Sequence, residues 1–380
     1  MKQPVVQKKN FIFLVAYGIY ICSLLLEITP LRESFDKGLQ LMRYASYGLF
    51  AFKIVIETRN EKKKCVFFAG LLLFLLVQSF IGGGRELVFM LFILFALHNV
   101  EVEEVFTTQI IVQAGCIALT FLLCVIGVFP NLEFYDHGQI RYAMGFVYAT
   151  LPGEVFLGLV FLLLFIRRNK LKIWEVAAII LTFAGIYYFT DSRTTIILGI
   201  VLSIFIYLQK FYTRPFKKGF GTFFFYQLMP VYMTLFSWIL QFVYNAHPGN
   251  RWMSLANRGL NGRLNWAKQS LGEYGIHVLG SNIAWVDNTV NLTRERYNFV
   301  DNAYIKLVLD YGWIVGILFL AAYLVIMNRM IQEENRQGCI LVCAVLVYAF
   351  MTPVLTSFIL NPLILLAGGI FHGKTKIRQT

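Results

Sequence analysis

Residues 155–166 read VFLGLVFLLLFI, an apolar run with no charged or hydroxyl side chain. Similar runs occur at 67–77 and at 117–129. A helix needs about 20 mostly apolar residues to cross the hydrocarbon core of a bilayer. Only helices and closed barrels satisfy every backbone polar group in lipid, and barrel strands alternate apolar with polar residues. Because these runs are continuously apolar, they predict membrane-spanning helices.

The whole chain shares this character, since 58% of its 380 residues are apolar and its mean hydropathy is +0.64. A soluble domain is roughly 45–50% apolar. The net charge of +13 does not indicate a nucleic-acid partner, because the basic residues occur in short clusters between the apolar runs. Short cytoplasmic loops collect Lys and Arg in this way. The charge therefore reports orientation in a lipid bilayer, and no nucleic acid is expected as a partner.

The fold class that we predict is an all-α, polytopic membrane protein with about 12 transmembrane helices. The spans are expected at 11–29, 40–57, 65–81, 86–99, 109–129, 146–166, 173–190, 195–209, 220–243, 303–327, 338–352 and 356–372. Starting from a cytoplasmic N-terminus, alternation puts all basic clusters inside, although the spans follow from hydropathy alone. Both termini are then cytoplasmic. The last two spans are short, so a tight or re-entrant hairpin is the alternative there.

Three parts follow from this topology. Residues 1–243 hold spans one to nine, residues 244–302 form a large external loop, and residues 303–380 hold spans ten to twelve and a cytoplasmic tail. A loop this long is usually functional or disordered, and its tryptophans and short helical patterns indicate order. The six cysteines all fall in apolar runs, without zinc-type spacing. No disulfide framework and no metal site are therefore expected.

Four arginines stand out on the predicted outer side: Arg85, Arg141, Arg193 and Arg263. A planar guanidinium is suited to phosphate because it donates two parallel hydrogen bonds. Three or four such groups converging at the outer interface would bind a lipid pyrophosphate. The alternative for each is a headgroup contact or an ion pair with a neighbouring acid. Arg193 is the strongest candidate, because almost no loop separates its two spans.

Other polar candidates lie in or beside the external loop. Asp301 stands where the loop re-enters the membrane, so it is either a general base toward a sugar hydroxyl or the N-cap of span ten. His247 and His277 lack the spacing of a metal site or a catalytic triad, so they are polar loop residues or substrate contacts. Trp266 is either a platform for a sugar ring or an interfacial anchor.

Five short motifs occur in a telling order: RYAMGF at 141–146, SRT at 192–194, GR at 262–263, DNAY at 301–304 and LDYG at 309–312. In this order, and with their predicted outer placement, they resemble the Wzy polysaccharide polymerases of the O-antigen polymerase and ligase superfamily. The resemblance covers about 139–372.

The resemblance implies a metal-independent, GT-C-like glycosyltransferase of the bacterial cytoplasmic membrane that needs no cofactor. Its substrates would be undecaprenyl-pyrophosphate-linked oligosaccharides, with one chain transferred onto the terminal sugar of another and undecaprenyl pyrophosphate released. A flippase and a chain-length regulator are the implied partners. The catalytic residues would be Asp301, Arg193 and Arg263. The substrate-binding residues would be Arg141, Asn302, Tyr304, Trp266, Arg85, His247 and His277.

Two departures from the family pattern matter. The His-Pro-Asn stretch often found after the first arginine is Thr150–Leu151–Pro152–Gly153 here. Position 301 holds Asp where the ligase branch often holds His, which favours the polymerase branch. A ligase remains the nearest alternative. A flippase for the same lipid-linked sugar is the alternative of a different class, although it should show related halves and polar residues in mid-span.

Overall fold

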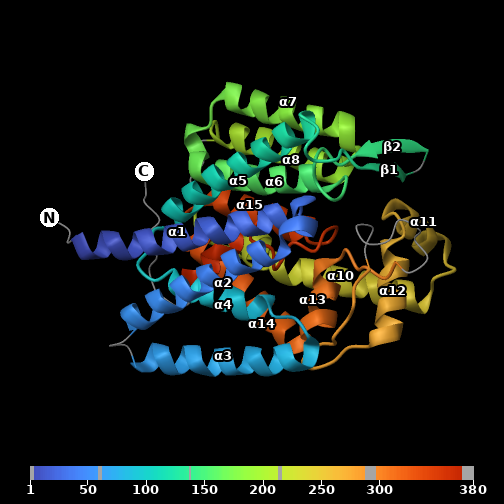
Figure 1. Cartoon of the computed structure of the whole chain (residues 1–380). Coiled ribbons are helices and arrows are strands. Elements are labelled where there is room, and N and C mark those ends of the chain that lie inside the picture. The colour runs from blue at the N-terminus through green and yellow to red at the C-terminus, as the bar shows by residue number, and fades with distance from the viewer. Residues whose placement is uncertain (1–3, 59–61, 137, 213–215, 287–296, 370–380) are drawn as a thin grey trace. The chain divides into compact units, whose positions relative to one another are not determined.

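The computed structural model describes residues 4–58, 62–136, 138–212, 216–286 and 297–369. The expected cytoplasmic tail at 370–380 lies outside these ranges. The chain divides into two packing units. Unit 1 contains residues 1–68, 89–215 and 358–380, and unit 2 contains residues 69–88 and 216–357. Figure 1 labels both strands and most of the helices.

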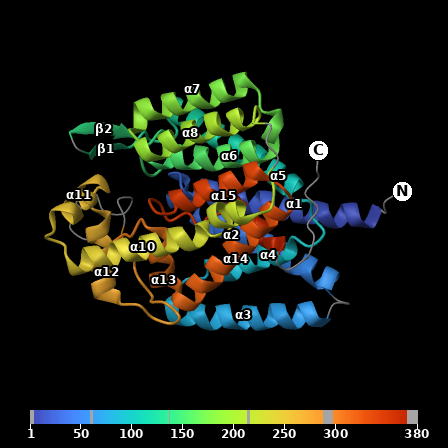
Figure 2. The same ribbon diagram turned by 180° about the vertical axis from the view of Figure 1, so that it is seen from behind.

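Unit 1 is mostly helical. Its elements are α1 (Pro4–Glu27), α2 (Leu31–Thr58), the start of α3 (Lys62–Gly82), most of α4 (Glu86–Ala96), α5 (Val102–Val125), β1 (Glu133–Asp136), β2 (Gln139–Tyr142), α6 (Leu151–Arg167), η1 (Arg168–Lys170), α7 (Ile173–Thr190), α8 (Arg193–Gln209) and η3 (Pro362–Ala367). Helices α5, α7 and α8 pack around α6, and Figure 2 shows the same grouping from behind. Because α6 is apolar on all sides, it suits this central position.

A β-hairpin departs from the all-α expectation. Strands β1 and β2 pair antiparallel, with Phe134 opposite Arg141 and Asp136 opposite Gln139. Only two residues separate the two strands in the sequence, which antiparallel pairing allows. The hairpin follows α5 and precedes α6, and it carries Arg141 on β2.

The last expected span, 356–372, is not a continuous helix where it is described. It contains η3 and helical residues at 368–369, and the residues before η3 run irregularly. Buried amides of α5 satisfy this backbone: Gln109 Nε2 donates to Phe358 O at 2.8 Å, and Gln113 Nε2 donates toward Ile359 O at 3.4 Å. Gly158 lets the segment approach, because a Cβ there would overlap Ile359 O. Irregular backbone at membrane depth requires such internal partners.

Unit 2 contains two broken helices that the sequence predicts as continuous. Its elements after the end of α3 are α9 (Phe220–Thr222), η2 (Phe223–Gln227), α10 (Met229–Ala246), α11 (Arg251–Gly259), α12 (Arg263–Tyr274), α13 (Ala303–Tyr311), α14 (Trp313–Gln332) and α15 (Arg336–Tyr348). The expected span 220–243 bends by 43° between η2 and α10, next to Pro230. The expected span 303–327 breaks at Gly312, where φ is +89°.

Five helices in the described ranges are long and apolar enough to cross a membrane, or six if the bent pair is one span. They are Asn10–Glu27, Lys62–Gly82, Val102–Val125, Ile173–Thr190 and Trp313–Gln332. The other expected spans are shorter, broken or less apolar. The chain is thus mostly helical and consistent with a membrane protein, while the count of 12 and the external position of 244–302 stay predictions.

Candidate functional site

Arg141 and Arg193 meet the same turn in unit 1, the one that joins α7 to α8. Arg141 Nε donates to Thr190 O at 2.6 Å. Arg193 makes a two-pronged ion pair with Asp191, with Nε and Nη2 each 3.1 Å from a carboxylate oxygen. Asp191 adopts the left-handed conformation, with φ of 46°, and this bend turns the chain into α8. The ion-pair alternative for Arg193 is therefore realised.

Two cations act on the Asp191 carboxylate. The Arg193 guanidinium, with a smaller contribution from Arg141, holds the pKa of Asp191 below its usual value. The side chain of Arg193 is 65% exposed, against 27% for Asp191. The guanidinium group of Arg193 is therefore accessible to an anionic ligand at this turn.

Arg263 and Asp301 form the main ion pair of unit 2. Arg263 Nε lies 2.8 Å from Asp301 Oδ2, and both side chains are 25% exposed. Arg263 opens α12, and Asp301 comes just before α13. The two helices are held together by a core of Ala267, Ile305 and their neighbours. The fold thus brings together two predicted catalytic residues that are far apart in the sequence.

The N-cap interpretation of Asp301 is wrong, because the next residue caps α13. Asn302 Oδ1 accepts from Tyr304 N at 3.0 Å and from Ile305 N at 3.4 Å. Asn302 is buried, so its side-chain oxygen is used for the helix rather than for substrate. Asp301 instead pairs with Arg263. An aspartate and an asparagine in sequence are both good caps, and the sequence alone does not choose between them.

A second polar network on α13 was not predicted. Lys306 Nζ lies 2.9 Å from Asp310 Oδ2 and 3.8 Å from the centre of the Trp285 ring. The indole Nε1 of Trp285 donates to Asp310 Oδ1 at 2.6 Å. This network fixes the loop before α13 against the helix. The Lys–Asp spacing of four residues was the available signal, because it places both side chains on one helix face.

The end of α13 forms a close backbone junction with the segment before it. Trp313 N donates to His277 O at 3.2 Å, and a Cβ at Gly312 would overlap Val278 O. Tyr311 Oη donates to Glu86 Oε2 at 2.9 Å. Arg85 is next to Glu86 and is exposed. The junction therefore places Arg85 in unit 2, on the connection between α3 and α4.

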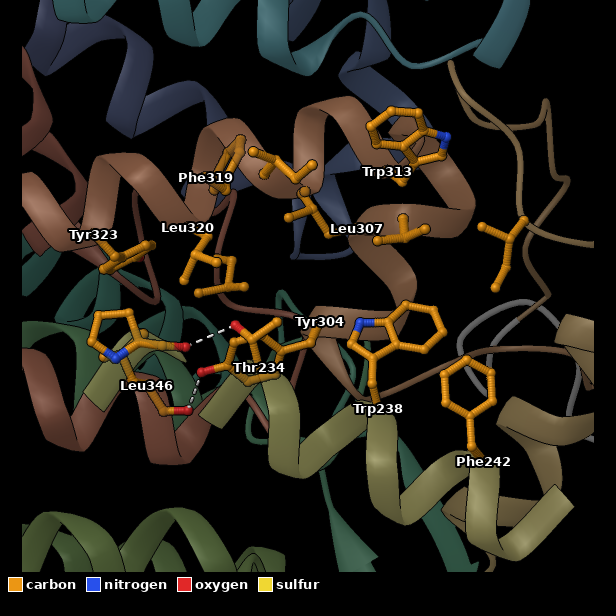
Figure 3. Close-up of a pocket in the computed structure, with 16 residues that line it drawn as sticks. Thr234, Trp238, Phe242, Tyr304, Leu307, Trp313, Phe319, Leu320, Tyr323 and Leu346 are labelled. Carbon is orange, nitrogen blue, oxygen red and sulfur yellow. Dashed lines mark hydrogen bonds between the residues drawn. The ribbon is translucent and has the colours of Figure 1, made fainter. Parts of the chain in front are cut away.

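An apolar groove lies between α10, α13 and α14, with α15 contributing to its wall. Its volume is ≈ 310 Å³, and Figure 3 shows the aromatic side chains around it, among them Trp238, Phe242 and Trp313. The hydroxyl of Tyr304 in the wall donates to Leu346 O at 2.7 Å. Thr234 likewise donates to Pro230 O at 2.8 Å. Both of these hydroxyls are bonded to backbone, and most of the lining residues are apolar, so the groove favours hydrocarbon.

The remaining predicted residues have these positions. His247 ends α10 and is exposed. His277 is exposed, with Nε2 2.8 Å from Tyr274 O. The ring of Trp266 contacts Tyr297 edge to face at 4.8 Å, so one edge is used for packing. Arg141 and Arg193 belong to unit 1 and the other predicted residues to unit 2. The convergence of all four arginines stays a prediction.

The comparisons with known proteins add no relative. No protein-family model matches this chain, and neither a curated protein nor a solved structure matches it significantly. Among the described residues, no group of three or more His, Cys, Asp or Glu could hold a metal ion.

Proposed function

We propose that the chain is a membrane-embedded glycosyltransferase of the Wzy type. It joins oligosaccharide repeat units carried on undecaprenyl pyrophosphate, at the outer face of the bacterial cytoplasmic membrane. The proposal is supported by the motif resemblance and by one arrangement in unit 2. There, the Arg263–Asp301 pair lies at the start of α13, and the same helix forms a wall of the apolar groove.

The arrangement suits a molecule with a charged head and a hydrocarbon tail. Tyr304 lines the groove and lies in the first turn of α13, three residues after Asp301. The α10 wall from Pro230 to Phe242 extends over about 18 Å, which suits one extended hydrocarbon chain. A polyprenyl tail in the groove would bring its pyrophosphate toward the polar residues at the start of α13.

The chemistry requires one proton acceptor and cationic groups. The acceptor sugar hydroxyl attacks the anomeric carbon of the donor, and its proton passes to the Asp301 carboxylate. The bond between that carbon and the pyrophosphate oxygen breaks, so the pyrophosphate leaves with the electron pair. Arg263 stabilises the developing negative charge, which is usually the largest catalytic contribution. As the pyrophosphate draws Arg263 away, the Asp301 carboxylate becomes a better base.

Arg193 and Arg141 are proposed as further pyrophosphate contacts. Their support is that both guanidinium groups lie at the α7–α8 turn and that the side chain of Arg193 is exposed. Because the guanidinium group of Arg193 is already paired with Asp191, a phosphate must compete with that carboxylate. The contribution of Arg193 is therefore smaller than that of Arg263 in this proposal.

A ligase with the same donor is the second candidate. It would use the same pair and groove but deliver the polymer to a different acceptor. Deleting the gene and separating the surface glycan on a gel distinguishes the candidates. Single-repeat material supports the polymerase, and loss of attachment of a full-length polymer supports the ligase. Accumulation of lipid-linked units on the inner leaflet would contradict both and indicate a flippase.

A further inference from the structure

Helix α11 is short, basic and capped. Its sequence, RWMSLANRG, contains two arginines and no acidic residue. Asn250 caps it, with Oδ1 accepting from Trp252 N at 2.8 Å. The cap fixes the first turn, so the orientation of Trp252 is set by the helix rather than by a flexible loop.

One face of α11 is exposed, and it is amphipathic. Trp252 is 73% exposed and Leu255 is 48% exposed. Arg251 and Arg258 are also exposed, whereas Met253 and the other inward residues are partly buried. At about 100° per residue, the exposed side chains cover an arc of about 120°. Both arginines lie at one edge of this arc, and Leu255 and Trp252 cover the rest of it.

The position of α11 limits what can cover this face. Only four residues separate it from the end of α10 at Ala246, so it starts at most about 17 Å from that end. Helix α10 is the second half of the bent pair that is apolar enough to cross a membrane. The headgroup region is about 5–8 Å thick on each side. A helix at this distance can reach it.

We propose that α11 lies in the headgroup region of the bilayer as an interfacial anchor for anionic phospholipid. Trp252 and Leu255 enter the boundary with the acyl chains, and Arg251 and Arg258 contact the phosphates. Tryptophan is enriched at this depth, and the basic flanks complement anionic lipid. The anchor role does not depend on the proposed enzymatic activity.

The anchor has a consequence for the candidate site. Asn257 of α11 accepts from the start of α12 twice, with its backbone oxygen 2.8 Å from Gly262 N and its Oδ1 3.2 Å from Asn265 N. Arg263 lies between these two residues. The depth of α11 in the bilayer therefore sets the height of Arg263 above the membrane surface.

The test uses tryptophan quenching in the full-length protein. The chain is reconstituted into vesicles containing phosphatidylglycerol brominated near the headgroup, and the difference between wild type and Trp252→Phe isolates Trp252 emission. We expect that emission to be largely lost in brominated vesicles. Trp266→Phe is the matched control, because Trp266 of α12 packs on Tyr297, and its emission should persist. Replacing Arg251 and Arg258 by Gln should weaken the quenching of Trp252.

Three results would overturn the anchor. Trp252 emission could be unaffected by brominated lipid and quenched by aqueous iodide, which places α11 in water. Its quenching could be equally strong in vesicles of brominated phosphatidylcholine alone and insensitive to the arginine changes. That result would rule out recognition of anionic phospholipid. Shielding that appears only at high protein-to-lipid ratio would assign the face to a second copy of the chain.

Discussion

The α7–α8 turn and the start of α13 both pair an arginine with an aspartate, but they do so by different means. Arg193 pairs with Asp191 two residues away, and its side chain is 65% exposed. Arg263 pairs with Asp301 across 38 residues, and its side chain is 25% exposed. The first pair is a product of local turn geometry. The second exists only because α12 packs on α13, so it reports the tertiary fold and is better shielded from solvent.

The largest expected effect concerns the long-range pair. Asp301→Asn removes the base but keeps the size of the side chain, so activity should fall by about 10²–10⁴-fold. Arg263→Lys keeps the charge but loses the planar fork, and it should remove most activity. Both are measured with purified lipid-linked repeats, because a cellular assay can hide a hundredfold defect.

The exchanged double variant Arg263→Asp with Asp301→Arg controls for a purely structural pair. It restores the opposite charges in the reverse order. If the pair only holds α12 against α13, the exchange should recover activity. Recovery would end the catalytic assignment and leave a structural ion pair, whereas continued inactivity of a folded double variant supports separate roles.

The next effect concerns the apolar groove beside the Arg263–Asp301 pair. The proposal assigns no such groove to the α7–α8 turn. Leu320→Trp fills the groove of unit 2 and displaces part of the lipid tail. Each excluded methylene costs about 0.8 kcal/mol, so losing two or three raises the apparent KM by about 10–100-fold. Leu318→Trp on the same helix is the control, since Leu318 is exposed outside the groove. Equal effects of the two substitutions would contradict a tail site.

A stability comparison sharpens the contrast between local and tertiary geometry. Gly312→Ala imposes a strained positive φ and a clash with Val278 O, so it should destabilise unit 2 by about 1–3 kcal/mol. Asp191→Gly keeps an allowed left-handed φ and should change stability little. Thermal unfolding of the purified proteins in detergent measures both. A larger loss of stability for Asp191→Gly than for Gly312→Ala would contradict this contrast between a local turn and a tertiary junction.

The smallest expected effect belongs to the local pair. Arg193→Lys retains the charge near Asp191, and exposed ion pairs contribute little, so activity should fall only a few-fold. The measurement is the same lipid-linked assay. A loss as large as that of Arg263→Lys would show that the exposed fork binds pyrophosphate directly and would remove the distinction between the two pairs.

Apolar runs predict most of the helices, because burial in lipid or protein interior needs continuous apolar sequence. They do not predict the break at Gly312 or the irregular stretch near Ile359. Those depend on buried glutamines and close backbone contacts from other parts of the chain. Hydropathy also gives no sign of the hairpin at β1 and β2.

The sequence predicts which residues belong to the candidate site, but it does not predict which of them contact one another. Sequence singles out Arg263 and Asp301 separately, yet their contact depends on the packing of two helices. It also leaves the choice of helix cap between Asp301 and Asn302 undecided, because both residues suit that position. The groove joins α10 to residues more than 60 positions later, so no local pattern indicates it.

Polymerisation by the purified chain tests the central claim most directly. The wild-type protein and Asp301→Asn are reconstituted separately with undecaprenyl-pyrophosphate-linked repeat units, and the products are separated by size. The wild type should produce a ladder of longer glycans, with one undecaprenyl pyrophosphate released for each bond formed, and Asp301→Asn should leave the single repeats almost unchanged. Single repeats that persist with the folded wild-type protein, or an equal ladder from Asp301→Asn, would contradict the account.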